Sequence, residues 1–265
     1  MIKLIATDMD GTFLKPDQTY DTKRFAALHQ RLQAAGIRFV VASGNQYYQL
    51  LSYFADYPQT IFVAENGAYI RSLQKVYALH SFKPDVVKQI LAKLATVADI
   101  KVLVCGQHSA YTLATTDPAY VAGMRHYYHR LAVVADYDQV DDKILKFAIN
   151  CADARTQALV DELTEALAGL AQPTSSGHGD IDLIQPGVHK AAGLAELGAQ
   201  LGITLDEMAA FGDGGNDLEM LQEVGLGVAM ANAQPAVAAV ADAHCGTNID
   251  SGVLTYIEQL LEERA

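Results

Sequence analysis

The stretch Ile2-Lys3-Leu4-Ile5-Ala6-Thr7-Asp8-Met9-Asp10-Gly11-Thr12-Phe13-Leu14 decides the fold of this chain. Its first part is short, apolar and rich in β-branched residues, which is typical of a strand buried on both faces. Asp8 and Asp10 follow two residues apart, so on an extended chain their side chains lean the same way. Ligands of open α/β sheets bind beyond the carboxyl ends of the strands, and Gly11 permits a tight turn there. Two acids at one rim repel each other unless a cation or a shared proton offsets the charge, so the pair is a candidate ligand site. The alternative is an ordinary turn, in which Asp is a frequent residue.

The segments after this strand predict a parallel sheet. Apolar residues at helical spacing indicate a helix over 21–35, which Gly36 ends. Apolar strands are expected over 37–42 and 61–64, with a helix between them. Strands that alternate with helices at this spacing indicate βαβ units with right-handed crossovers. The turn signal Asn66-Gly67 introduces a small hairpin over 68–79.

From residue 82 the rhythm changes. Helices are expected over 84–97, 118–130 and 154–168, and short strands over 101–105, 110–114, 144–150, 172–176 and 181–185. A stretch of about 100 residues with this pattern is large enough for a separate α+β module, with a mostly antiparallel sheet. The alternating rhythm resumes at 186 and continues to a closing amphipathic helix over 252–263.

The fold class expected is therefore α/β, a Rossmann-like parallel sheet with helices on both faces and an inserted α+β cap domain. Residues 1–81 and 186–265 form the core, and residues 82–185 form the cap. Because the insertion leaves and re-enters at the ligand edge of the sheet, it suits a lid that closes over a site and excludes water.

Composition argues against several classes of function. The 265 residues carry a formal net charge of −12 without a cluster of lysine and arginine, so no nucleic-acid partner is expected. No apolar run approaches the roughly 18–20 residues that span a bilayer, so no membrane association is expected. The three cysteines are scattered, which favours free thiols in a reducing compartment. We therefore expect a cytoplasmic protein, either a monomer or a weak homo-oligomer.

Four polar segments are expected at one edge of the parallel sheet. They are Asp8-Met9-Asp10-Gly11-Thr12, Ser43-Gly44-Asn45, Lys190 and Gly212-Asp213-Gly214-Gly215-Asn216-Asp217. Each has an ordinary explanation by itself, as a helix cap, a solvated lysine or a turn, but their common position favours phosphoryl transfer. Asp8 and Asp213, with a backbone carbonyl near Asp10, provide the oxygen ligands that Mg²⁺ prefers. Lys190 and Ser43 can hold phosphate oxygens, and Asp217 can anchor the shell behind the metal.

The order of these segments resembles that of the haloacid dehalogenase superfamily over the whole chain. Three further stretches resemble Cof-type (type IIB) phosphatases with a large inserted cap, bacterial sugar phosphatases most of all: residues 42–50, 64–68 and 126–131. The resemblance implies that Asp8 is the nucleophile, which forms an aspartyl-phosphate, and that Asp10 is the general acid and then the general base. It implies a Mg²⁺ cofactor bound by Asp8, the Asp10 carbonyl and Asp213. The implied phosphate-binding residues are Ser43, Gly44, Lys190 and Asn216, with Asp217 and Thr12 in support.

One position departs from the family pattern. Many relatives carry Thr-Gly-Arg where this chain has Ser43-Gly44-Asn45, so the hydroxyl is kept and a positive charge is lost. No contact of that arginine is therefore transferred to Asn45. The cap is expected to choose the substrate, and the candidates for substrate or cap contact are Asn45, Asn66 and His178, the last in a glycine-flanked turn.

The sequence thus predicts a Mg²⁺-dependent phosphatase that hydrolyses sugar phosphates or similar small phosphorylated metabolites. Two alternatives stay open. A phosphomutase or phosphotransferase uses the same aspartyl-phosphate but excludes water, so it transfers the phosphoryl group between sugars. A non-catalytic sensor that binds phosphate or Mg²⁺ is disfavoured, because a pure binder has no need of an acid beside the nucleophile.

Overall fold

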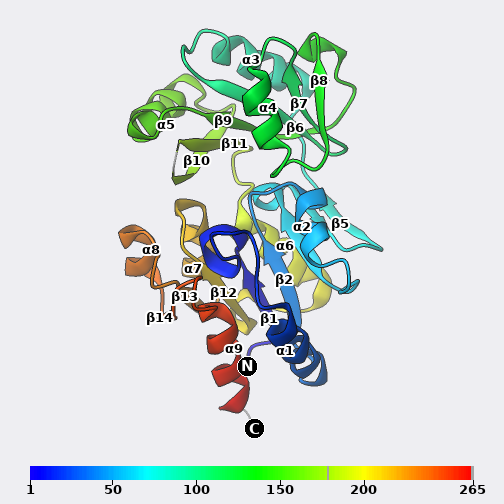
Figure 1. Ribbon diagram of the computed structural model, residues 1–265, viewed down its shortest axis with the longest axis vertical. Coiled ribbons are helices and arrows are strands. Elements are labelled where there is room, and N and C mark those ends of the chain that lie inside the picture. Colours follow the sequence, from blue (N-terminus) through cyan, green and yellow to red (C-terminus); the bar gives the residue numbers. More distant parts are fainter. Residues whose placement is uncertain (178, 264–265) are drawn as a thin grey trace.

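The computed structural model describes residues 1–177 and 179–263. Two β-sheets follow one another along the long axis of the molecule, and the N-terminus and helix α9 (Gly252–Glu262) lie at the end far from the smaller sheet (Figure 1). The larger sheet, called the core sheet below, has eight strands, and the smaller one, called the cap sheet, has six.

The core sheet has the strand order β14-β13-β12-β1-β2-β3-β4-β5. Its strands are β1 (Leu4–Thr7), β2 (Arg38–Ala42), β3 (Ile61–Ala64), β4 (Tyr69–Arg71), β5 (Val76–Leu79), β12 (Met208–Gly212), β13 (Leu226–Ala229) and β14 (Ala243–His244). The strands from β14 to β3 are parallel, and β4 and β5 add the expected antiparallel hairpin. β1 lies between β12 and β2 with Leu4, Ile5 and Ala6 fully buried, as a strand covered on both faces requires.

Helices cover both faces of the core sheet. They are α1 (Thr22–Ala34), α2 (Tyr47–Tyr53), α6 (Lys190–Leu201), α7 (Leu218–Glu223), α8 (Pro235–Val240) and α9 (Gly252–Glu262). α1, α2 and α9 pack in one hydrophobic cluster that includes Phe25 and Ile257, and α6, α7 and α8 pack in another that includes Leu194. Ile5 of β1 belongs to the first cluster and Leu4 to the second, because successive side chains of a strand point to opposite faces. The expected Rossmann-like fold class is confirmed.

The cap sheet has the order β10-β11-β9-β6-β7-β8 and is antiparallel except for the pair β7 and β8. Its strands are β6 (Lys101–Gly106), β7 (Ala110–Leu113), β8 (Leu131–Val134), β9 (Ile144–Asn150), β10 (Gln172–Gly177) and β11 (Asp180–Ile184). Its helices are α3 (Pro84–Leu94), α4 (Pro118–Met124) and α5 (Thr156–Ala166). Ile90 of α3 and Leu159 of α5 share one hydrophobic cluster, and Val121 of α4 belongs to another.

One expected helix is shorter than its sequence pattern indicates. The helix expected over 118–130 ends at Met124, and Leu131–Val134 forms the edge strand β8. The sequence of β8 is short, apolar and partly β-branched, and it pairs with β7 in parallel register. That pairing partner precedes α4 in the chain, so no local pattern identifies the strand.

We propose that residues 82–185 form the cap and that the core consists of residues 1–81 and 186–265. β5 of the core sheet ends at Leu79, all six cap strands follow, and α6 of the core begins at Lys190. Among the described residues, no helix is long and apolar enough to cross a membrane.

Candidate active site

The candidate site is a cavity of about 590 Å³ between the carboxyl edge of the core sheet and the cap. The cap contributes apolar and aromatic side chains to its wall, together with the charged residues Lys146, Asp180 and Asp182. Of the residues singled out in the sequence, those that line the cavity are Asp8, Asp10, Ser43, Gly44, Asn45, Asp213 and Asn216. Segments that are far apart in the sequence therefore meet in one place, as the edge of a parallel sheet requires.

The turn after β1 brings the first segment against the fourth. Residues Met9–Phe13 form one irregular helical turn in which Gly11 has a φ of +75°. A side chain at Gly11 would collide with the carboxylate of Asp213, so only glycine permits this approach. The Thr12 hydroxyl donates a hydrogen bond of 2.7 Å to Asp213 Oδ1, which ties the two loops together.

Three carboxylates and one lysine form the floor of the site. Lys190 has no exposed surface, and its Nζ donates to Asp8 Oδ1 at 2.6 Å and to Asp217 Oδ1 at 2.7 Å. Burial opposes the charge of Lys190, but Asp217 and Asp8 keep its pKa above the ordinary range. Burial also raises the pKa of Asp8 well above its usual value, against the attraction of Lys190. Burial and then the charge of Asp217 raise the pKa of Asp213 to about 6.

The donor set of this floor fits a divalent metal ion. Ligand atoms of Asp8, Asp213 and Asp217 lie within 4.8 Å of one another. Both oxygens of Asp217 are already engaged, since Oδ1 accepts from Lys190 and Oδ2 accepts from the backbone N–H of Asp213 at 3.0 Å and of Gly214 at 3.1 Å. The carboxylates of Asp8 and Asp213, by contrast, each accept a hydrogen bond through Oδ1 only, within the described ranges 1–177 and 179–263. Oxygen ligands of this kind are those that Mg²⁺ prefers.

Asp10 faces a different set of partners from Asp8. Gln18 donates to its Oδ1 at 2.9 Å, and the amide of Asn45 donates to its Oδ2 at 2.5 Å. Asn45 therefore contacts the proposed acid through a neutral amide. Ser43 accepts a hydrogen bond of 3.1 Å from the backbone N–H of Asn45, so its hydroxyl also caps this turn.

The cap reaches the core through a buried polar cluster. Lys146 on β9 donates to the Gly44 carbonyl at 2.7 Å and to Asp182 Oδ2 at 2.8 Å. Glu65 Oε2 lies 3.5 Å from the same ammonium group. Asn66 donates to Asp182 at 2.6 Å and accepts a 3.1 Å hydrogen bond from Asn216 of the Asp213 loop. The cluster thus connects the cap to two of the four polar segments.

The turn that carries this cluster has an unusual backbone. Glu65, Asn66 and Gly67 have φ values of +51°, +55° and +100°, a region that is costly for residues with a side chain. Glu65 is 1% exposed, and burial, which outweighs the attraction of Lys146, raises its pKa to about 7. The turn does not line the cavity, but Asn66 is hydrogen-bonded to the lining residues Asp182 and Asn216, and strain of this kind is often found at functional sites.

Lys190, expected to bind phosphate, lies behind Asp8 and is not among the residues that line the cavity, so its contact with phosphate stays a prediction. His178 lies outside the described residues.

Sequence reasoning missed four residues that shape the site. They are Gln18, Glu65, Lys146 and Asp182. The available signal for Lys146 was a single charged residue inside the largely apolar strand β9, and for Asp182 it was a charged residue between two apolar ones in β11. A charge at such a position is buried at high cost unless a partner compensates it.

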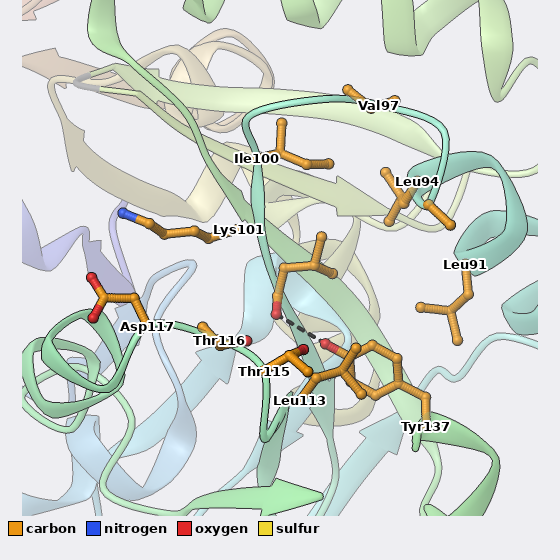
Figure 2. A pocket seen from close by; sticks show the side chains of 12 residues that line it. Leu91, Leu94, Val97, Ile100, Lys101, Leu113, Thr115, Thr116, Asp117 and Tyr137 are labelled. Atoms are coloured by element: carbon orange, nitrogen blue, oxygen red, sulfur yellow. Dashed lines mark hydrogen bonds between the residues drawn. The ribbon is translucent and has the colours of Figure 1, made fainter. Parts of the chain in front are cut away.

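Figure 2 shows a second cavity, of about 470 Å³, whose lining residues all belong to the cap. Leu91, Leu94 and Ile100 contribute apolar side chains to it, and the Tyr137 hydroxyl donates to the Val102 carbonyl at 3.1 Å. None of the carboxylates or lysines of the site at the core edge lines this cavity, so we assign the chemistry to the larger one.

The chain is similar to known proteins both in sequence and in structure. The chain matches the family model of the haloacid dehalogenase-like hydrolases (Hydrolase_3) over residues 5–257. It is 44% identical over 265 residues, 100% of this chain and 98% of the relative, to 5-amino-6-(5-phospho-D-ribitylamino)uracil phosphatase YbjI of Escherichia coli strain K12. It is 26% identical over 275 residues, 96% of this chain and 97% of the relative, to pyridoxal phosphate phosphatase YbhA of the same strain. The crystal structure of SMU.1108c from Streptococcus mutans UA159 superimposes with a TM-score of 0.94 at 32% identity, covering 99% of this chain and 100% of that one.

Proposed function

Since this chain belongs to the haloacid dehalogenase-like hydrolase family, whose relatives above are named phosphatases, we propose that it is a Mg²⁺-dependent phosphatase that works through an aspartyl-phosphate on Asp8. The observation that carries the proposal is the position of Asp8. Its carboxylate lies in the wall of the cavity, and Lys190 holds one of its oxygens from behind at 2.6 Å. The other oxygen is the one that we assign as the attacking atom.

The proposed reaction has two steps. In the first, the Asp8 carboxylate attacks phosphorus, the bond to the leaving oxygen breaks, and Asp10 gives that oxygen a proton. In the second, a water molecule attacks the aspartyl-phosphate, Asp10 takes its proton, and phosphate leaves with Asp8 regenerated. Gln18 and Asn45 hold both oxygens of Asp10 and so orient the carboxyl group for these transfers.

The other residues at the edge of the core sheet have supporting roles in this proposal. Ser43, Gly44 and Asn216 line the cavity and provide polar contacts for phosphate oxygens, while Lys190 and Asp217 fix the floor below. Mg²⁺, for which Asp8, Asp213 and the Asp10 carbonyl are the proposed ligands, supplies positive charge that offsets the charge of the phosphoryl group.

The substrate proposed is a small phosphorylated metabolite. The name of the 44% identical relative makes 5-amino-6-(5-phospho-D-ribitylamino)uracil the first candidate. This compound combines a polyol chain with a planar ring, and the cap wall offers Tyr120, Tyr127 and Tyr128 beside the polar cluster. Sugar phosphates present the same hydroxyl groups and are the second candidate class.

The direct test is phosphate release from a panel of phosphorylated metabolites that includes these two classes, with Mg²⁺ or with EDTA. We expect release by the wild-type protein in Mg²⁺ and its loss in Asp8→Asn. Transfer of phosphate between sugars without release would identify a phosphomutase instead. Binding of phosphate without turnover of any member of the panel would identify a sensor.

A further inference from the structure

Two of the charged cap residues in the wall of the cavity, Lys146 and Asp182, form a pair that has no part in the chemistry proposed above. They lie on neighbouring antiparallel strands, β9 and β11, and form an ion pair of 2.8 Å. Ion pairs buried in this way contribute little to stability on balance, so their presence in the wall calls for another explanation.

Lys146 is surrounded by partners within the protein. It is 2% exposed, its ammonium group donates hydrogen bonds to the Gly44 carbonyl and to Asp182, and the carboxylate of Glu65 lies 3.5 Å away as an ion-pair partner. It is therefore a positioning residue. It compensates the charge of Asp182 and ties that side chain to the loop that contains Gly44.

Asp182 is held on one side and open on the other. Its Oδ2 accepts hydrogen bonds from Lys146 at 2.8 Å and from Asn66 at 2.6 Å. Its Oδ1 has no hydrogen-bond partner among residues 1–177 and 179–263, and 21% of the side chain is exposed at the cavity. Two donors fix the orientation of this carboxylate, and its second oxygen can still accept a hydrogen bond at the cavity. Such a carboxylate is a preorganised hydrogen-bond acceptor.

We propose that Asp182 Oδ1 selects substrates whose leaving group carries an O–H or N–H donor, such as a polyol chain. The inference rests on the proposed function and identifies the residue that recognises the leaving group of the substrate. The physical reason is that a donor-free leaving group would cover this charged oxygen and leave it without a partner, which is more costly than a poor apolar fit.

The variant Asp182→Asn tests the proposal with little change of shape. The Asn oxygen is expected to face the two donors, Lys146 and Asn66, which turns the NH₂ group toward the cavity. The group presented to the leaving group then changes from an acceptor to a donor. We would measure kcat/KM for D-ribitol 5-phosphate and for phenyl phosphate, whose leaving group has no donor when it is bound as the ester.

The ratio of the two kcat/KM values, polyol over phenyl, is expected to fall about 10- to 100-fold in Asp182→Asn. This ratio is measured on one preparation, so it does not depend on the fraction of folded protein. Asp182→Ala removes the acceptor altogether and should lower the ratio in the same direction. The matched control is Asp161→Asn, the same change on the exposed face of α5, and it should keep the wild-type ratio.

A wild-type ratio in both Asp182 variants would overturn the proposal while the proposed function stands. No phosphate release from either substrate by the wild-type protein would overturn the proposed function and this inference with it. The two failures are therefore distinguishable by the behaviour of the wild-type protein alone.

Discussion

Replacement of Glu65 by glutamine should stabilise the protein strongly at alkaline pH and much less at acidic pH. Glu65 is 1% exposed, and its Oε2 has no hydrogen-bond partner in the described part of the chain. Lys146 lies 3.5 Å away, but burial outweighs this attraction and raises the pKa of Glu65 from its ordinary 4.5 to about 7. Glutamine has nearly the same shape and carries no charge at any pH.

The sign and the size of the effect follow from proton linkage. The folded protein binds the Glu65 proton more tightly than the unfolded chain, so wild-type stability falls as the pH rises from about 4.5 to about 7. A shift of this size corresponds to about 3 kcal/mol at pH 8 and to about 1 kcal/mol at pH 5. Because Glu65→Gln removes this penalty, the variant should exceed the wild type by these amounts.

Urea denaturation of the two proteins in EDTA, at pH 5 and at pH 8, measures the difference in the free energy of unfolding. The matched control is Glu162→Gln, since the Glu162 side chain is 53% exposed and should show no difference at either pH. Equal stability of wild type and Glu65→Gln at pH 8, or a gain that is the same at both pH values, would refute the reasoning. A loss of stability at pH 8 would mean that Lys146 stabilises the carboxylate after all.

Four further predictions concern the floor of the site and the turn beside it. Asp8→Asn should lower kcat for phosphate release at least about 10³-fold while the circular dichroism spectrum stays that of the wild type, and near-normal turnover would exclude the aspartyl-phosphate. Lys190→Met leaves buried carboxylates without their cation and should reduce the free energy of unfolding by about 3–5 kcal/mol in urea, so unchanged stability would contradict the ion-pair assignment. Gly67→Ala places a Cβ 2.5 Å from the His189 carbonyl oxygen at a φ of +100° and should cost about 2–4 kcal/mol. Gly36→Ala, at a φ of +69° with no atom within 4 Å of the Cβ, should cost about 1–2 kcal/mol, and equal losses would argue against the close approach. EDTA should abolish phosphate release and Mg²⁺ should restore it, whereas turnover that persists in EDTA would remove the metal from the proposal.

The core of the fold could be predicted from the sequence because its signals are local. Each buried strand is a short apolar run, each helix has its own periodicity, and their alternation implies a parallel sheet. β8 could not be predicted in this way, because its partner β7 lies on the other side of α4 in the chain. Its residues favour a strand only where that neighbour is present.

The sequence by itself also determined where the candidate catalytic residues lie. Asp8, Ser43 and Asp213 each follow a strand, and the carboxyl ends of parallel strands share one edge whatever the distance along the chain. Tertiary structure alone decided which groups complete the wall. Lys146 and Asp182 are charged residues flanked by apolar ones in cap strands, and their partners Gly44 and Asn66 belong to loops of the core sheet. Compensation of a buried charge is a property of the packed interior, so it exists only once cap and core are in contact.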